Sequence, residues 1–383
     1  MTPGARIAAA AEILDLILDG MAAEKALTTW ARHSRFAGSK DRAAVRDHVF
    51  EALRRKRSAA AIGGAMTGRG LMLGLLRGQG ADPADVMNGQ GHALSPPEAS
   101  ETGRPPAEGA EAADLPDWLW PLWQQSLGDQ AVACADALKD RASVFLRVNL
   151  RKASVEAVQA TLSEAGIDAQ RSPLSETALE IAPGARGLRN LQIFNEGLVE
   201  LQDAASQAVV DALPLRDGMR VLDMCAGGGG KTLAMGARAD LRLLAYDSAP
   251  ARMRDLADRA ERAGLPVTMT DTPEADGPYD LVLCDVPCSG SGSWRRAPDG
   301  KWLLTPDVFA ALGRTQAEIL DRAAGLVAPE GALAYATCSM LEPENGAQIE
   351  AFVARHPEWR VVTQRAWRVT DGADGFFVTV LTR

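Results

Sequence analysis

The 383-residue sequence is poor in several residue types, and each scarcity narrows the classes of protein to consider. Its five cysteines are an odd number spread along the chain, so a disulfide framework is not expected. Its four histidines are scattered and no second close cysteine pair is present, so no metal site is expected. No apolar run reaches the roughly eighteen residues of a membrane span, and the N-terminal stretch lacks the apolar segment of a secretory signal. We therefore expect a cytoplasmic monomer without a membrane partner.

Composition and charge are otherwise those of a globular protein. Hydrophobic residues make up 46% of the chain and charged residues 24%, and the length predicts two or three domains. A formal net charge of -9 argues at first against a nucleic-acid partner, because phosphate binding depends on lysine and arginine. The charge is uneven, however: residues 79–117 carry a net charge of -7 and residues 1–60 one of +4. RNA therefore remains a possible partner.

The chain divides into four regions by pattern. Residues 1–78 show apolar residues at helical spacing, and residues 79–117 are acidic and rich in proline and glycine, which indicates a linker or long loop. Residues 118–202 mix helical and strand-like runs and predict a small α+β module. In residues 203–383 strands alternate with helices, which predicts an α/β fold with a mostly parallel sheet. The strands expected there are 220–224, 241–246, 267–270, 281–284 and 332–336, with 376–381 as a hairpin at the edge.

A glycine-rich turn follows the first of these strands. Cys225-Ala226-Gly227-Gly228-Gly229-Gly230-Lys231-Thr232 would let the backbone approach a ligand and present free N–H groups to it. The P-loop pattern fails, because it needs glycine where Cys225 stands, and the dinucleotide pattern fails at Thr232. Asp247 ends the second strand, twenty residues after Gly227, where a carboxylate can bind ribose hydroxyls. An adenosine-containing cofactor is favoured, and a purely structural turn remains the alternative.

Several reactive side chains follow the ends of the predicted strands. Ligands of an open parallel sheet collect outside the carboxyl ends of its strands, so these side chains should face one crevice. They are Cys225, Asp247, Asp271, Asp285, Cys288 and Cys338. A lone cysteine at a strand end is usually a small buried residue, but two in separate serine-rich loops favour a nucleophilic role. Cys284, within an apolar run, and Cys134, on a helix, are expected to be buried packing residues.

Three strings in this region carry a family resemblance. VLDMCAGGGGKT, DVPCSGSG and YATCSMLEPEN resemble motifs of the Sun-type family of RNA cytosine-5 methyltransferases, which use S-adenosylmethionine. The strings FNEGLVELQDAASQ and DGFFVTVLTR are similar to further family signatures, and residues 36–57 resemble the helical NusB-like domain of bacterial ribosomal members. The family usually has Ala-Pro where this chain has Gly227-Gly228, which would make the turn more flexible. The resemblance implies a class I methyltransferase Rossmann-like core with an antiparallel edge strand.

The resemblance also implies roles for individual residues. Cys338 would be the nucleophile that adds to carbon 6 of cytosine, and Cys288 would assist release of the methylated base. Asp285 would bind or protonate the ring nitrogen, and Lys231 would favour the thiolate. The backbone from Cys225 to Gly230 would cradle the methionine part of the cofactor. Asp247 would bind its ribose and Asp271 its adenine, with Arg252 either orienting this network or merely solvated.

The expected partner is RNA, most simply RNA of the small ribosomal subunit. A base must leave its stack to reach a thiol in a crevice, which favours single-stranded or loop RNA. Trp294, Arg295 and Arg296 would stack on a base and contact phosphate, or else Trp294 would cap its loop. The run Arg54-Arg55-Lys56-Arg57 is either a phosphate contact or a solvated helix end. Two rivals are weighed against this interpretation. The presence of both Cys288 and Cys338 argues against an inactive RNA-binding or assembly protein, which could lose either one. An amino-methyltransferase normally has an Asn/Asp-Pro-Pro-aromatic motif, which Asp285-Val286-Pro287-Cys288 does not match.

Overall fold

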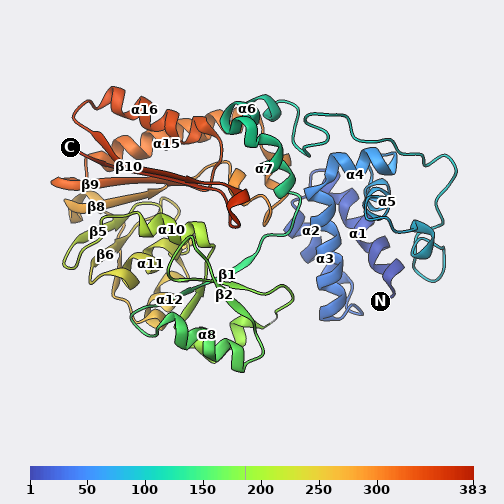
Figure 1. The fold of residues 1–383 in the computed structure, drawn as a ribbon, viewed down its shortest axis with the longest axis horizontal. Helices are drawn as coiled ribbons and strands as arrows, with labels where there is room; N and C mark the ends of the chain where they lie inside the picture. Colours follow the sequence, from blue (N-terminus) through green and yellow to red (C-terminus); the bar gives the residue numbers. More distant parts are fainter. Residues whose placement is uncertain (186) are drawn as a thin grey trace. The chain divides into compact units, whose positions relative to one another are not determined.

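A computed structural model describes residues 1–185 and 187–383 (Figure 1). The chain forms two compact units. The helical unit comprises residues 1–141 and 294–305, and the sheet unit comprises residues 142–293 and 306–383. This division differs from the one expected from sequence in two respects. Residues 118–141 group with the helices and not with the α+β module, and residues 294–305 leave the region of alternating strands and helices to join the helical unit.

Among the described residues the helical unit contains five N-terminal α-helices and three that come later in the chain. They are α1 (Pro3–Leu18), α2 (Ala23–His33), α3 (Ser39–Arg54), α4 (Lys56–Gly63), α5 (Gly68–Gly78), α6 (Leu119–Leu127), α7 (Ala131–Ala137) and α14 (Gly300–Leu303). Glycine allows α4 and α5 to approach closely, since a Cβ atom on Gly63 would lie 1.8 Å from the carbonyl oxygen of Gly70. Within the described residues no single helix is long and apolar enough to cross a membrane, although α4 and α5, bent by 88°, pass that test as a pair.

Residues 79–117 have little regular structure, as expected, but they pack along the helical unit. Met87 and Leu115 are fully buried there. The buried carboxylate of Asp114 accepts hydrogen bonds from the Ser58 hydroxyl at 2.6 Å and from the Ser58 backbone N–H at 2.9 Å. Glu101 pairs with Arg69 at 2.5 Å. The expected linker is therefore a segment bound to the helices, because its apolar and acidic residues have partners on them.

The sheet unit contains a small antiparallel sheet with strand order β2-β3-β1-β4. Its strands are β1 (Val144–Val148), β2 (Ala169–Arg171), β3 (Ala178–Ile181) and β4 (Val199–Leu201), accompanied by α8 (Val155–Glu164) and α9 (Gln192–Asn195). The Ser154 side chain caps α8 by accepting from the backbone N–H of Ala157. The short strand β2 is the one that the sequence did not indicate.

The larger sheet has seven strands in the order β10-β11-β9-β8-β5-β6-β7. They are β5 (Arg220–Asp223), β6 (Arg242–Ala245), β7 (Val267–Met269), β8 (Tyr279–Asp285), β9 (Val327–Thr337), β10 (Arg360–Trp367) and β11 (Phe376–Thr382). Strands β5 to β9 pair in parallel, and β11 is antiparallel to both of its neighbours. The predicted α/β class is confirmed. The hairpin differs in detail, because β10, which was not predicted, lies at the edge outside β11.

Helices cover both faces of this sheet (Figure 1). They are α10 (Ala204–Asp211), α11 (Gly230–Arg238), α12 (Leu256–Ala263), α13 (Pro273–Asp276), α15 (Pro306–Ala324) and α16 (Gly346–Arg355). Strand β8 alternates between two cores: Leu281 and Leu283 pack with residues of α10 and α11, whereas Val282 and Cys284 pack with α15 and α16. A parallel strand buried on both faces explains the continuous apolar run. It also gives Cys284 its packing role.

Candidate active site

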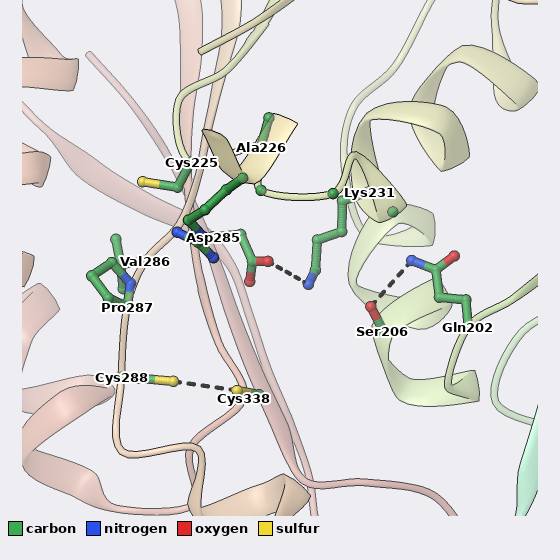
Figure 2. A pocket seen from close by; sticks show the side chains of 14 residues that line it. Gln202, Ser206, Cys225, Ala226, Lys231, Asp285, Val286, Pro287, Cys288 and Cys338 are labelled. Carbon is green, nitrogen blue, oxygen red and sulfur yellow. Dashed lines mark hydrogen bonds and ion pairs between the residues drawn. The ribbon is translucent and has the colours of Figure 1, made fainter. Parts of the chain in front are cut away.

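Two cysteine thiols lie together at the carboxyl edge of the large sheet. Strand β8 leads into the loop that carries Cys288, and the adjacent strand β9 leads into the loop that carries Cys338. Their Sγ atoms are 3.4 Å apart, within hydrogen-bonding distance (Figure 2). Residues fifty positions apart in the chain thus form one pair because parallel neighbouring strands end at the same edge.

The two thiols differ in their readiness to ionise. The hydrogen bond from the Cys288 thiol holds the pKa of Cys338 below its ordinary value, although burial opposes this. The same hydrogen bond, followed by burial, raises the pKa of Cys288 well above its ordinary value. Cys338 is therefore the more readily ionised thiol of the pair, and Cys288 the one that holds its proton more tightly. A thiolate is the nucleophilic form of cysteine.

An ion pair lies beside the cysteines in the same cavity (Figure 2). The Lys231 ammonium at the start of α11 donates to the Asp285 carboxylate at the end of β8, at 2.8 Å. Burial, the largest single influence, would lower the pKa of Lys231, but the charge and hydrogen bond of Asp285 together with the charges of Cys338 and Asp223 raise it. The buried side chain therefore stays protonated, and its positive charge also helps to lower the pKa of Cys338.

A cavity of about 370 Å³ joins the cysteines, the ion pair and the glycine-rich turn. Its lining residues are Gln202, Ser206, Cys225, Ala226, Gly227, Gly228, Gly230, Lys231, Arg252, Asp285, Val286, Pro287, Cys288 and Cys338. Ten of these were expected at the site from sequence. Burial raises the pKa of Cys225 to about 12, so this third cysteine in the cavity is a neutral thiol.

The glycine-rich turn has the shape of a ligand cradle. Gly227 and Gly229 adopt left-handed φ angles of 51° and 80°, which favour glycine. A Cβ atom on Gly229 would lie 2.1 Å from Cδ1 of the fully buried Leu256. No side chain caps the N-terminus of α11, which leaves its N–H groups for a ligand. Gly227 stands where the family usually has alanine, and its backbone takes a left-handed conformation that alanine adopts only with strain.

The expected adenosine-binding residues are only partly gathered at this cradle. Asp247 is 2% exposed, and its carboxylate accepts the Gly227 N–H at 2.9 Å and pairs with Arg252 at 3.1 Å. It therefore orders the turn directly. Arg252 lines the cavity with a side chain that is 60% exposed. Asp271 is exposed after the end of β7, and neither it nor Asp247 is among the residues that line the cavity.

Two polar residues of the YATCSMLEPEN string hold both cysteine loops, and sequence reasoning gave them no role. The buried Glu344 carboxylate accepts hydrogen bonds from the hydroxyls of Ser289 and Ser339, each at 2.5 Å, and from the backbone N–H of Ser289 at 2.8 Å. Asn345 donates to the Ser339 carbonyl oxygen at 2.9 Å and accepts from Thr337 at 2.6 Å. Because each serine follows a cysteine in the chain, these bonds fix both thiols.

The small sheet also contributes to the site. Gln202 and Ser206 line the cavity. Both lie in the string FNEGLVELQDAASQ, whose resemblance to a family signature was the signal that could have marked them as site residues. Arg147 of β1 is buried and donates to the carbonyl oxygen of Gly230 at 2.7 Å and to Gln202. Burial lowers the pKa of Arg147 to about 10. The small sheet therefore fixes one side of the glycine-rich turn.

Asp223 is a buried acid that the sequence reasoning overlooked. It ends β5, just before the glycine-rich turn, and accepts a hydrogen bond from the Thr232 hydroxyl at 2.6 Å. Its second oxygen, Oδ1, is buried without a hydrogen-bond partner among the described residues. Burial raises the pKa of Asp223 to about 7, although the Thr232 hydrogen bond opposes the shift. It ties the strand to the first turn of α11.

The aromatic and basic residues expected to touch RNA are largely internal to the helical unit. Trp294 is 2% exposed and stacks on Trp123, with ring centroids 6.1 Å apart. The stacking role on RNA is therefore corrected to a packing role. Arg54 is buried and donates to the Arg295 carbonyl oxygen at 2.9 Å, and Arg57 pairs with Asp117 at 2.7 Å. The basic run from Arg54 is mostly committed to contacts within the helical unit.

The remaining cysteines and possible metal ligands add no second centre. Cys134 and Cys284 are buried, in agreement with their expected packing roles. Over residues 1–185 and 187–383 no group of three or more His, Cys, Asp or Glu side chains is arranged to hold a metal ion. The chemistry that this edge can support is therefore that of two hydrogen-bonded thiols of unequal acidity, a buried ammonium–carboxylate pair and a backbone cradle.

Comparison with known proteins identifies the family. Residues 210–381 match the family described as 16S rRNA methyltransferase RsmB/F, and residues 115–185 match the ferredoxin-like domain of RsmF/B-like methyltransferases. The chain belongs to the RsmB/F family. Ribosomal RNA small subunit methyltransferase B of Klebsiella pneumoniae is 35% identical over 254 residues, covering 63% of this chain and 58% of that protein. The chain thus spans about three fifths of the length of this RsmB/F relative.

Solved structures share the fold. The protein PH0851 superposes with a TM-score of 0.79 at 24% identity, covering 100% of this chain and 99% of that one. A structure described as NSun6 from Pyrococcus horikoshii with SFG gives a TM-score of 0.61 at 17% identity, covering 70% of this chain and 98% of that one. At these identities the likeness establishes architecture alone. The RsmB/F chain thus shares its fold with these two proteins.

Proposed function

We propose that this protein methylates carbon 5 of a cytosine in RNA, with S-adenosylmethionine as methyl donor and small-subunit ribosomal RNA as substrate. The observation that carries the proposal is the Cys288–Cys338 pair, with sulfurs 3.4 Å apart, at the mouth of a glycine-rich cradle. A methyl acceptor that is already nucleophilic, such as an amino group, would need no thiolate. Carbon 5 of cytosine is a poor nucleophile and needs covalent activation.

The residues of the cradle fit the cofactor. The positive φ angle of Gly229 and the lack of space for a side chain there suit close approach of a ligand to the backbone. Gly227, Gly228 and Gly230 line the cavity together with Arg252, and these residues would hold the methionine part. Asp247, which accepts the Gly227 N–H and so orders the turn, would bind the ribose hydroxyls. When bound, S-adenosylmethionine supplies an electrophilic methyl group.

The cysteines divide the covalent chemistry between them. The Cys338 thiolate forms a bond to carbon 6 of the ring, and the electron pair displaced from the carbon 5–carbon 6 double bond makes carbon 5 nucleophilic. The lowered pKa of Cys338 favours the thiolate that this step needs. Cys288 keeps its proton at this stage because its pKa is raised. After methylation the carbon 5 proton is lost and the carbon–sulfur bond breaks, a step that Cys288 assists.

The ion pair positions and stabilises the base. Asp285, paired with the Lys231 ammonium, would accept a hydrogen bond from the exocyclic amino group of cytosine. The Lys231 ammonium is the member of the pair that carries a proton, so the two together offset negative charge at the ring nitrogen. This modifies the role expected for Asp285 alone. A buried ion pair costs little reorganisation when charge develops, since its charges are already in place.

Transfer of labelled methyl groups tests the proposal. Purified protein, S-adenosylmethionine labelled in the methyl group and small-subunit ribosomal RNA should give labelled 5-methylcytidine on nucleoside mass spectrometry. Label at N4 of cytidine, or at any other position, would contradict the reaction. No label in any RNA, with RNA still bound, would favour the second function considered, an inactive RNA-binding or assembly protein with this fold.

A further inference from the structure

A second cavity, of about 630 Å³, lies in the helical unit. It is lined by Thr28, Ala31, Arg32, Arg35 and Arg42, which come from α2, the start of α3 and the turn between them. All three arginines are exposed. This arginine hollow takes no part in the chemistry described above, because none of its residues belongs to the sheet unit.

The three arginines of the hollow carry unneutralised charge. Across residues 1–185 and 187–383, none of their guanidinium groups has an acidic partner within ion-pair distance. The acids nearest in sequence are already engaged elsewhere. Asp41 pairs with Arg6 at 2.8 Å and with the N-terminal ammonium at 3.1 Å, and Glu24 pairs with Arg46 at 2.5 Å. Three of the basic side chains of residues 1–60 that lack an acidic partner among the described residues therefore lie together at this hollow.

An aromatic side chain adjoins the hollow. Phe36 follows Arg35 directly in the turn between α2 and α3, and its side chain is 76% exposed. It is the most exposed of the large hydrophobic side chains in the described parts of the chain. Exposing a phenylalanine beside unpaired guanidinium groups has no value for folding. Both groups suit one ligand class, because guanidinium forks bind phosphates and aromatic faces stack on bases.

We propose that the arginine hollow binds the sugar–phosphate backbone of the RNA substrate and that Phe36 stacks on an unpaired base next to it. The proposal rests on the proposed function for its ligand class and adds a docking surface remote in sequence from the cysteines. Phosphates would be the anionic partners that Arg32, Arg35 and Arg42 lack among the described residues. An acidic protein would also offer charge, but it would not explain the exposed ring of Phe36 as well as a base does.

Charge substitution in the full-length chain tests the hollow. The triple variant Arg32→Gln, Arg35→Gln, Arg42→Gln should bind small-subunit RNA roughly 10- to 100-fold more weakly at moderate salt, and its dependence of log affinity on log salt should be shallower by about 2 to 3. The matched control removes three exposed arginines from the sheet unit: Arg360→Gln, Arg365→Gln, Arg368→Gln. This control should change RNA affinity less than about threefold, because it alters the same total charge elsewhere.

A separate substitution tests the aromatic contact. Phe36→Ala should weaken binding of single-stranded RNA about 5- to 100-fold while leaving the salt dependence unchanged, since stacking releases no counterions. Both hollow variants should keep the thermal unfolding midpoint of the parent, because the altered side chains are exposed. Deleting residues 1–78 would be a weaker test, since residues 79–141 and 294–305 pack with them and would lose their core.

The outcomes separate this inference from the proposed function. An arginine variant with unchanged affinity and salt slope, or equal losses in the variant and its control, would overturn the hollow as the docking site. Retained RNA binding together with lost binding of an acidic polypeptide would overturn it in favour of a protein partner. If the parent chain methylates cytidine while the hollow variant keeps its KM, the inference fails and the function stands. If RNA binding depends on the hollow but no methyl group is transferred, the inference stands and the proposed function fails.

Discussion

Ser339 donates its hydroxyl hydrogen bond to Glu344 at 2.5 Å, and through this bond the residue after Cys338 is fixed to a buried carboxylate. The same carboxylate also accepts a hydrogen bond from the hydroxyl of Ser289, the residue after Cys288. A single acid thus sets the separation of the two sulfurs. Glu344 contacts neither sulfur in the structure, so it acts as a positioning residue.

Glu344→Gln should lower kcat by roughly 10- to 100-fold with little effect on the affinity for S-adenosylmethionine. The amide offers one acceptor oxygen in place of two and turns an N–H₂ group toward donors, which leaves about 1–3 kcal/mol of buried hydrogen bonding unsatisfied. Single-turnover methylation and cofactor titration measure the two effects. Glu344→Asp keeps the carboxylate and should recover part of the rate. Equal rates for the parent and the Gln variant would remove the positioning role.

Cys288→Ala should move the ionisation of Cys338 to higher pH. The hydrogen bond from Cys288 stabilises the thiolate, so its removal raises the pKa of Cys338 toward and beyond that of an ordinary thiol. The rate of alkylation of Cys338 by iodoacetamide, followed against pH by mass spectrometry, reports this ionisation. The parent should react at lower pH than the variant, and coincident profiles would contradict the assignment of donor and acceptor.

Asp223→Asn should change how stability depends on pH. Burial raises the pKa of Asp223 to about 7 in the folded chain, above its ordinary value of 3.8, so the folded state holds the proton more tightly than the unfolded state. The contribution is present below the unfolded pKa and is lost as pH rises through about 7. Asparagine cannot ionise, so the variant should lose less stability than the parent between about pH 4 and pH 7. Melting temperatures across this range check the difference, and parallel curves would contradict it.

Gly229→Ala should weaken binding of S-adenosylmethionine by roughly tenfold or more. The new Cβ would lie 2.1 Å from Leu256 and forces the glycine-rich turn to move. Gly218→Ala is the matched control: Gly218 has a similar φ of 82°, but nothing lies within 4 Å of a Cβ placed there. Both variants carry the strain of a left-handed alanine, about 1 kcal/mol. Calorimetric titration should show a loss of affinity for the Gly229 variant only, and equal affinities would argue against the cradle.

Much of the active-site edge could be predicted from sequence because it depends on local pattern. Apolar strands followed by loops bearing Cys225, Asp285, Cys288 and Cys338 indicate both the parallel sheet and the edge at which these residues meet. Strand β10 could not be predicted, because its residues are mostly exposed, including Val361 and Val362, and so lack the alternation that marks a half-buried strand.

Other features depend on partners that are distant in the chain. Arg54 lies in a run that resembles a solvated basic patch, yet its partner is the Arg295 carbonyl oxygen, 241 residues away. Trp294 follows the loop that carries Cys288, but its segment belongs to the helical unit. Its ring stacks on Trp123. No local pattern in the sequence assigns a role to Glu344. Its role depends on hydrogen bonds to two loops that meet only in the folded structure.

The central claim is tested most directly by trapping the covalent intermediate. Cys288→Ala protein incubated with S-adenosylmethionine and small-subunit RNA should form an RNA–protein complex that survives denaturing electrophoresis, because Cys338 bonds to the base and its release is impaired. The double variant Cys288→Ala, Cys338→Ala should form none. A denaturation-resistant complex that persists without Cys338, or its absence from a Cys288→Ala protein that still binds RNA and cofactor, would contradict the account.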